Sequence, residues 1–133
     1  MVGHAIAART VDATNAYGEG DLQVTALNRV NLSLETAKFT AIMGPSGSGK
    51  STLMHVMAGL DQATSGDVIV GGVDLSTLSE KDLTLLRRDR IGFVFQAYNL
   101  VPVLTAQENV EFIMLLQNRS KAERTREAKK LLD

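Results

Sequence analysis

The chain has 133 residues, 44% of them hydrophobic, a length and composition that suit one ordinary domain with an apolar core. Fourteen basic residues against fifteen acidic ones leave a net charge of −1, which excludes a global field that would attract nucleic acid or an anionic membrane surface. The lack of cysteine excludes disulfides, thiolate catalysis and cysteine-based zinc sites, and no apolar run approaches the roughly 20 residues that span a bilayer.

The first third of the chain predicts a small antiparallel layer of strands. Residues 4–14 mix polar and apolar side chains with Val and Thr, as an edge strand does, and residues 17–21 follow as a turn. Residues 22–27 and 30–35 alternate well enough for two more strands, with a hairpin-like connection at residues 28–29.

A glycine-rich loop between an apolar run and a helical pattern is the strongest motif in the chain. Residues 44–52 read Gly-Pro-Ser-Gly-Ser-Gly-Lys-Ser-Thr and match the phosphate-loop pattern G-x-x-x-x-G-K-[ST] at every fixed position. Residues 39–43 resemble a buried strand, and residues 53–60 carry apolar side chains at near-helical spacing. The sequence therefore predicts a strand, a phosphate-binding loop and a helix in succession.

The residue types of this loop suit a nucleoside triphosphate. Glycines let backbone N–H groups approach phosphate oxygens, and the start of the following helix favours an anion. Lys50 has the reach for the β- and γ-phosphates, and the Ser51 hydroxyl is a ligand for Mg²⁺. The predicted nucleotide-binding residues of the loop are Gly44, Pro45, Ser46, Gly47, Ser48, Gly49, Lys50, Ser51 and Thr52.

Residues 59–90 predict a turn, a strand and a helix. Residues 59–66 are rich in turn formers, and residues 67–72 read as a strand that ends in a Gly-Gly turn. Ser79 precedes an acidic first turn, so a helix is expected from there to about Arg90.

Residues 91–133 predict a second buried strand and two helices. Residues 91–95 form a continuous apolar run, as in a parallel strand buried on both faces, and Gln96 follows at the carboxyl end, where open α/β sheets bind ligands. Residues 105–108 and 120–123 are capping-box sequences, each of which begins a helix.

With these motifs placed, the sequence resembles the N-terminal part of an ATP-binding-cassette (ABC) transporter ATPase of the lipoprotein-releasing and macrolide-export type. The resemblance extends over essentially the whole chain. It implies an α/β fold: a P-loop NTPase core with a mostly parallel sheet and flanking helices, an N-terminal antiparallel β layer, and an incomplete C-terminus. The motifs that carry it are Tyr17, residues 44–52, Gly59-Leu60-Asp61 with Ser65-Gly66, Leu85 to Arg88, and Ile91 to Gln96 followed by Asn99-Leu100 and Leu104-Thr105.

The resemblance implies a role for each matching residue. Tyr17 is the aromatic residue stacked on adenine, and Gln96 is the glutamine that contacts Mg²⁺ and the attacking water and senses the membrane subunit. Lys50 and Gln96 are then the catalytic candidates, Ser51 and Gln96 the metal candidates, and ATP and Mg²⁺ the cofactors. Taken alone, Tyr17 is also compatible with simple packing at the end of a strand.

The later motifs of the family do not occur in this sequence: a Leu-Ser-Gly-Gly-Gln signature, an apolar strand ending in Asp-Glu, and a switch histidine. The general base and the second Mg²⁺ carboxylate therefore have no candidates. We expect residues 1–133 to be a truncated nucleotide-binding domain with little or no ATP turnover alone.

The resemblance also implies partners. In the complete family, two such domains sandwich ATP and power export or lipoprotein release by a membrane permease. We therefore expect a permease that docks near Gln96, a second ATP-binding domain, no nucleic acid, and a cytoplasmic position at the inner face of the cell membrane. Two alternatives stay open: a non-catalytic fragment in which residues 96–103 dock on a permease helix, and a small P-loop nucleotide kinase, whose loop reads nearly the same.

Overall fold

The computed structural model describes residues 5–133, which pack as two compact units. The first unit comprises the described residues up to Leu83, and the second is Thr84–Asp133. Each unit buries apolar side chains of its own, such as Val56 in the first and Met114 in the second. His4, the predicted start of the first strand, lies outside the described residues.

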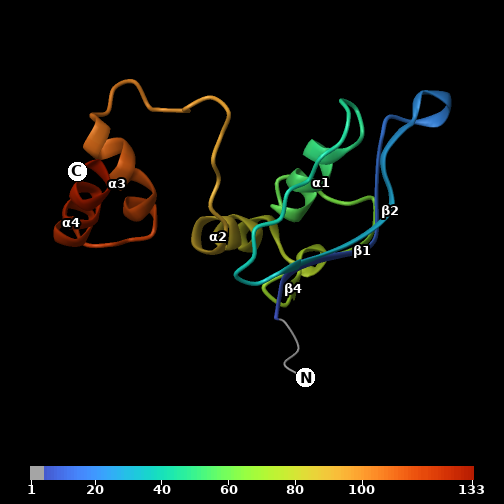
Figure 1. Ribbon diagram of the computed structural model, residues 1–133, viewed down its shortest axis with the longest axis horizontal. Coiled ribbons are helices and arrows are strands. Elements are labelled where there is room, and N and C mark those ends of the chain that lie inside the picture. Colours follow the sequence, from blue (N-terminus) through green and yellow to red (C-terminus); the bar gives the residue numbers. More distant parts are fainter. Residues whose placement is uncertain (1–4) are drawn as a thin grey trace. The chain divides into compact units, whose positions relative to one another are not determined.

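A four-stranded antiparallel sheet with the order β2-β1-β3-β4 forms the first unit. The two long strands, β1 (Ile6–Tyr17) and β2 (Val24–Glu35), run side by side in Figure 1. The other side of β1 pairs with β3 (Ser65–Val70), which is followed by β4 (Val73–Asp74). The predicted antiparallel layer is confirmed, but the first strand lies inside the sheet rather than at its edge, because both of its sides are hydrogen-bonded.

The strand β2 corrects a second prediction. Two strands joined by a hairpin at residues 28–29 were expected, whereas β2 is continuous and pairs with β1 along its length. Residues 28–29 lie opposite Thr14 alone, and Arg29 adopts a φ of 49° while its N–H donates to the Thr14 hydroxyl at 3.1 Å. The irregularity is therefore a β-bulge, which bends a strand without ending it.

The helix α1 (Lys50–Met57) packs against the strands β1, β2 and β3. Its buried face carries Leu53, Val56 and Met57. The helix itself was predicted from apolar spacing that includes Met54 and Leu60, but these two side chains are exposed. Of two short 3-10 helices, η1 (Gly20–Leu22) lies between β1 and β2 along the chain, and η2 (Leu75–Thr77) lies between β4 and the next helix. The sheet and α1 thus form the core of the first unit.

Three predicted helices are confirmed: α2 (Glu80–Arg90), α3 (Ala106–Leu116) and α4 (Lys121–Leu132). Both capping boxes are present, with Thr105 and Ser120 as the caps of α3 and α4. The helices α3 and α4 pack on each other within the second unit (Figure 1). None of the helices within residues 5–133 is long and apolar enough to cross a membrane.

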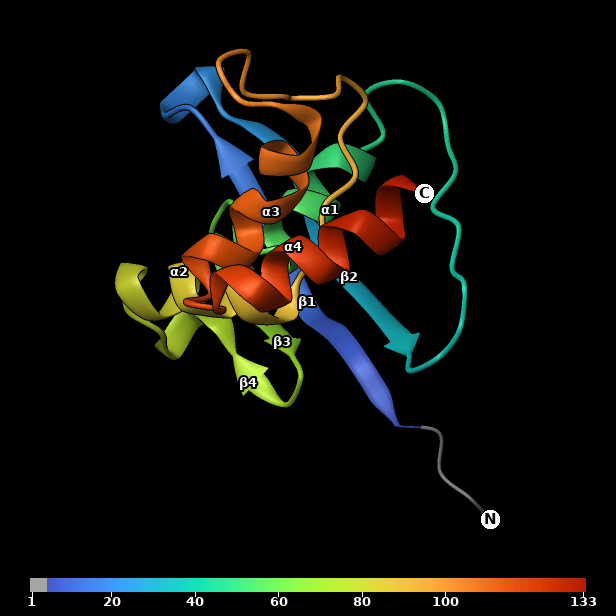
Figure 2. The same cartoon turned by 90° about the vertical axis from the view of Figure 1, so that its left-hand side faces the viewer.

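The two predicted parallel strands do not form in the described part of the chain. Residues 39–43 and 91–95 are irregular, and Phe39 and Val94 are fully exposed. Figure 2 shows the irregular course of the chain from the end of β2 to α1, in teal. A parallel strand needs paired neighbours, and all strand pairing within residues 5–133 is antiparallel. The α/β class is therefore confirmed, but the mostly parallel sheet is not formed by these residues.

Candidate functional site

The glycine-rich loop leads directly into α1. Gly47 and Gly49 adopt φ values of 79° and 90°, in the left-handed region that favours glycine. Gly49 is the residue before the helix, and a Cβ there would overlap the carbonyl oxygen of Ala26 in β2. The loop therefore approaches the sheet so closely that glycine is required at this position.

Lys50 folds back over this loop. Its Nζ donates to the carbonyl oxygens of Gly44 and Pro45 at 2.7 and 2.6 Å and lies 3.2 Å from Ser48 Oγ. The Ser48 hydroxyl in turn donates to the Pro45 carbonyl at 2.7 Å. All of these partners of Lys50 are neutral oxygens, so they hold the ammonium group in place without neutralising its charge.

The first turn of α1 is open to an anion. No side chain caps the helix at Gly49, and the first turn has no acidic residue. Unpaired N–H groups and the positive end of the dipole therefore remain at this end of the helix. Ser51 is exposed in this turn and Thr52 is half-buried. The geometry of the loop, Lys50 and the helix start suits a phosphate group.

Tyr17, the predicted adenine-stacking residue, ends β1 and is 46% exposed. Its hydroxyl donates to Asp61 Oδ2 at 2.6 Å. This hydrogen bond raises the pKa of Tyr17 and is the main reason why the pKa of Asp61 is lowered. The Thr52 side chain is near enough to the Tyr17 hydroxyl to lower the pKa of Tyr17. The structure thus brings Tyr17 next to the first turn of α1.

The sequence did not identify Asn15 or Asp61 as residues of this site. Asn15 is only 2% exposed, and its Nδ2 lies 3.4 Å from the Tyr17 hydroxyl and 3.3 Å from Asp61 Oδ2. In the sequence, Asp61 is part of a turn and of the Gly59-Leu60-Asp61 motif, but neither pattern assigns it a role at the site. The signal that could have found Asn15 is a polar residue within the half-buried run that ends in Tyr17.

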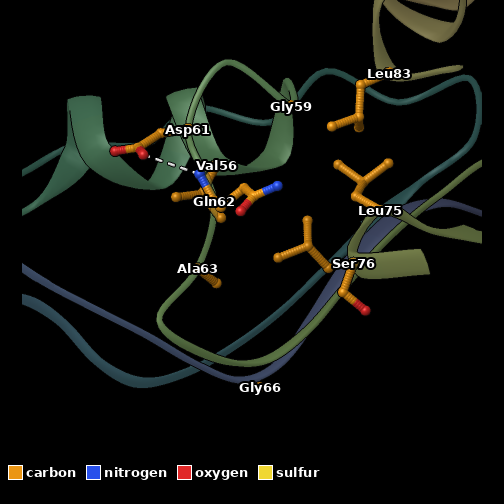
Figure 3. Close-up of a pocket in the computed structure, with 10 residues that line it drawn as sticks. Val56, Gly59, Asp61, Gln62, Ala63, Gly66, Leu75, Ser76 and Leu83 are labelled. Carbon is orange, nitrogen blue, oxygen red and sulfur yellow. Dashed lines mark hydrogen bonds between the residues drawn. The ribbon is translucent and has the colours of Figure 1, made fainter. Parts of the chain in front are cut away.

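A cavity of about 100 Å³ lies beside Asp61 within the first unit. Figure 3 shows its mixed lining, in which Leu75 and Leu83 are among the apolar side chains, and the hydrogen bond from the Gln62 N–H to Asp61 Oδ1 at 2.9 Å. Sites for drug-sized ligands start at about 300 Å³. This cavity is therefore too small for a nucleotide and is separate from the glycine-rich loop.

Gln96 belongs to the second unit, whereas the loop belongs to the first, so the structure describes them separately. Gln96 is exposed on an irregular segment that continues to Leu104. Over residues 5–133 there is no group of three or more His, Asp or Glu side chains that could hold a metal ion. A Mg²⁺ ion bound with a nucleotide does not need one, because phosphates and water supply most of its ligands.

A loop with these glycines, an uncompensated lysine and an open helix start is typical of P-loop proteins, and the comparison with known families narrows the class. Residues 27–133 match the family described as ABC transporter. The chain therefore belongs to the ABC transporter family, as its motifs predicted.

Among its relatives is the macrolide export ATP-binding/permease protein MacB of Marinobacter nauticus, which is 48% identical over 121 residues, covering 91% of this chain and 19% of that protein. An ABC transporter ATP-binding protein of Methanocaldococcus jannaschii, MJ1508, is 46% identical over 117 residues, covering 88% of this chain and 52% of that protein. The predicted relationship to macrolide-export ATPases is thus confirmed.

A solved structure of an ABC ATP-binding cassette is also similar to this chain. The ATP-binding cassette MJ0796 of M. jannaschii, in a dimeric post-hydrolysis state bound to ADP and Pi, superposes with a TM-score of 0.83 at 41% identity. The match covers 92% of this chain and 54% of that one. The chain therefore spans about half the length of the cassette and about a fifth of MacB.

Proposed function

We propose that this chain is the N-terminal part of the nucleotide-binding domain of an ABC transporter and that it binds Mg-ATP through residues 44–52. The observation that carries the proposal is the Lys50 ammonium group, held on the Gly44 and Pro45 carbonyl oxygens at 2.7 and 2.6 Å. Phosphate oxygens would replace these neutral partners with stronger, charge-assisted hydrogen bonds. The ADP and Pi bound to the related cassette MJ0796 support the choice of nucleotide.

The residues present fit a Mg-nucleotide. The loop and the first turn of α1 offer N–H groups to the phosphates, and the exposed Ser51 hydroxyl is suited to Mg²⁺. Tyr17 presents a partly exposed ring beside Thr52, where it would stack on the base. Bound Mg²⁺ would neutralise charge on the phosphates. We propose Gln96, from the second unit, as a further Mg²⁺ contact.

The roles in a complete transporter follow from the family. We propose Lys50 and Gln96 as the contributions of this chain to ATP hydrolysis, with a second ATP-binding domain as partner. The name of MacB joins ATP binding to a permease, which supports a membrane permease as a partner. We propose that this permease docks near Gln96. The ATP-binding subunit would lie in the cytoplasm, peripheral to the inner face of the cell membrane. The comparisons give no support to the nucleotide-kinase alternative.

The test is titration calorimetry with Mg-ATP on the folded chain. We expect measurable binding by the wild type and at least a tenfold loss of affinity in Lys50→Ala, because the ammonium group held over the loop is removed. Lys81→Ala, on the exposed first turn of α2, is the matched control and should bind like the wild type. If folded wild-type chain shows no association at millimolar Mg-ATP, the proposal is wrong, and binding to a permease without nucleotide would favour the docking-fragment alternative.

A further inference from the structure

The hydroxyl end of Tyr17 is held by a small polar network. Asp61, from the turn after α1, accepts a hydrogen bond from the hydroxyl through Oδ2, at an O–O distance of 2.6 Å. This length is typical of a hydrogen bond to an ionised carboxylate. Asn15, two residues earlier on β1, approaches the same hydroxyl with its Nδ2 at 3.4 Å. A surface tyrosine would ordinarily have its hydroxyl in water, so the network fixes an end of the side chain that is otherwise free.

The partners of Tyr17 are themselves fixed. Asp61 Oδ1 accepts the N–H of Gln62 at 2.9 Å, which leaves Oδ2 for Tyr17 and Asn15. The buried Asn15 amide lies 3.3 Å from Asp61 Oδ2 and 3.4 Å from the Gln62 carbonyl oxygen. The network therefore anchors the hydroxyl to both the sheet and the turn that follows α1.

This anchoring leaves the ring of Tyr17 in a defined position with an exposed surface. The Cα of Tyr17 is set by the last residue pair of β1 and β2, with Val24 opposite, and the hydroxyl is set by Asp61. A side chain fixed at both ends has little freedom left to lose when a ligand stacks on it, and such preorganisation increases affinity. The Thr52 side chain is near enough to lower the pKa of Tyr17, so the fixed ring lies beside the helix start that would take the phosphates.

We propose that Asp61 and Asn15 are positioning residues that fix the Tyr17 ring as a platform for the base of a bound nucleotide. The inference rests on the proposed function, since it needs nucleotide at the glycine-rich loop. Because neither residue belongs to the loop, they govern the part of the affinity that depends on the base. The part that depends on the phosphates remains with residues 44–52.

The experiment compares Mg-ATP with Mg-tripolyphosphate, which lacks base and sugar. Asp61→Ala should weaken Mg-ATP binding three- to tenfold and change tripolyphosphate binding less than twofold, and Asp61→Asn should show a smaller loss of the same kind. In a Tyr17→Phe background, which has no hydroxyl to hold, Asp61→Ala should have no further effect. Asp21→Asn, an exposed carboxylate in η1, is the control and should change neither affinity.

A spectroscopic measurement separates positioning from general stability. The chain has two tyrosines and no tryptophan, and the other tyrosine, Tyr98, is 92% exposed. In a Tyr98→Phe chain, tyrosinate absorbance during an alkaline titration therefore reports Tyr17 alone. Because the hydrogen bond to Asp61 raises the pKa of Tyr17, Asp61→Asn should lower that pKa toward its ordinary value. The Asn15 amide acts in the opposite direction and lowers the pKa of Tyr17, so Asn15→Ala should raise it.

The outcomes decide between the two proposals. Wild-type chain that binds neither ligand refutes the proposed function and the inference with it. Wild-type chain that binds both ligands, but in which Asp61→Ala weakens both equally or neither, refutes the inference alone. An unchanged pKa of Tyr17 in Asp61→Asn also overturns it, because the hydroxyl would then not depend on Asp61.

Discussion

The glycine-rich loop and the segment that carries Gln96 are both irregular, yet they are held very differently. The loop is fixed by Gly49 against Ala26, by Lys50 on its own carbonyls, and by the start of α1. Residues 92–100 are exposed. The residue that follows them, Val101, donates its N–H to Asn109 Oδ1 at 2.8 Å. The phosphate loop is thus held mainly by its own residues, with one close approach to β2, whereas an apolar strand depends entirely on pairing with other strands.

The strongest test of this difference is to replace one glycine in each region by alanine, which adds a Cβ. Gly49→Ala should lower the free energy of unfolding by roughly 2 kcal/mol or more, since left-handed strain alone is of order 1–3 kcal/mol and the Ala26 carbonyl blocks the added carbon. Mg-ATP binding should be lost in parallel. Urea unfolding and calorimetry would measure both effects.

The matched substitution is Gly92→Ala, whose added Cβ would meet nothing within 4 Å. Its effect on unfolding should stay within about 0.5 kcal/mol, as for most surface substitutions. An equal loss in the free energy of unfolding for Gly49→Ala and Gly92→Ala would contradict the idea that only the loop is fixed.

Asn109 offers a second test, because it holds the end of the segment that carries Gln96. Its side chain bonds the backbone of Val101 and also donates to the Leu104 and Thr105 carbonyls at 3.2 and 2.9 Å. Asn109→Ala should destabilise the second unit by about 1–2 kcal/mol, near the net value of one or two hydrogen bonds, and should speed amide exchange at Val101. Mg-ATP affinity should not change. A loss of affinity would show that the loop depends on this segment.

The smallest expected effect is the pH dependence of the contact between Asp61 and Tyr17. Because that contact lowers the pKa of Asp61, its contribution to stability is present above the unfolded value of about 3.9 and is lost as the pH falls through the lower folded value. The stability difference between the wild type and Asp61→Asn should therefore shrink between pH 6 and pH 3. Thermal melting across this range measures it, and a difference that grows toward low pH would contradict the assignment.

The features that the sequence predicted correctly depend on local chemistry. The glycines of the loop, the presence of a helix after it and the caps at Thr105 and Ser120 follow from residues within one or two turns. A helix carries its own hydrogen bonds, so its caps and spacing are sufficient signals.

The features that the sequence predicted wrongly depend on residues far along the chain. Residues 39–43 and 91–95 have the composition of strands, but a strand forms only where another strand pairs with it, which composition does not reveal. The bulge at Arg29 is defined by Thr14, and the network around Tyr17 by Asp61, which is 44 residues away. Pairing at such separations leaves no periodic signal in a single sequence.

The exposure of residues 39–43 and 91–95 has a consequence for self-association. Exposed apolar runs with strand composition are templates on which other copies of a chain can stack into aggregates. Each run here follows a basic residue, Lys38 or Arg90. Charged residues at the flanks of such runs act as gatekeepers, because stacked copies would bring like charges together. The basic flanks thus oppose the intermolecular β pairing that the exposed runs would otherwise favour.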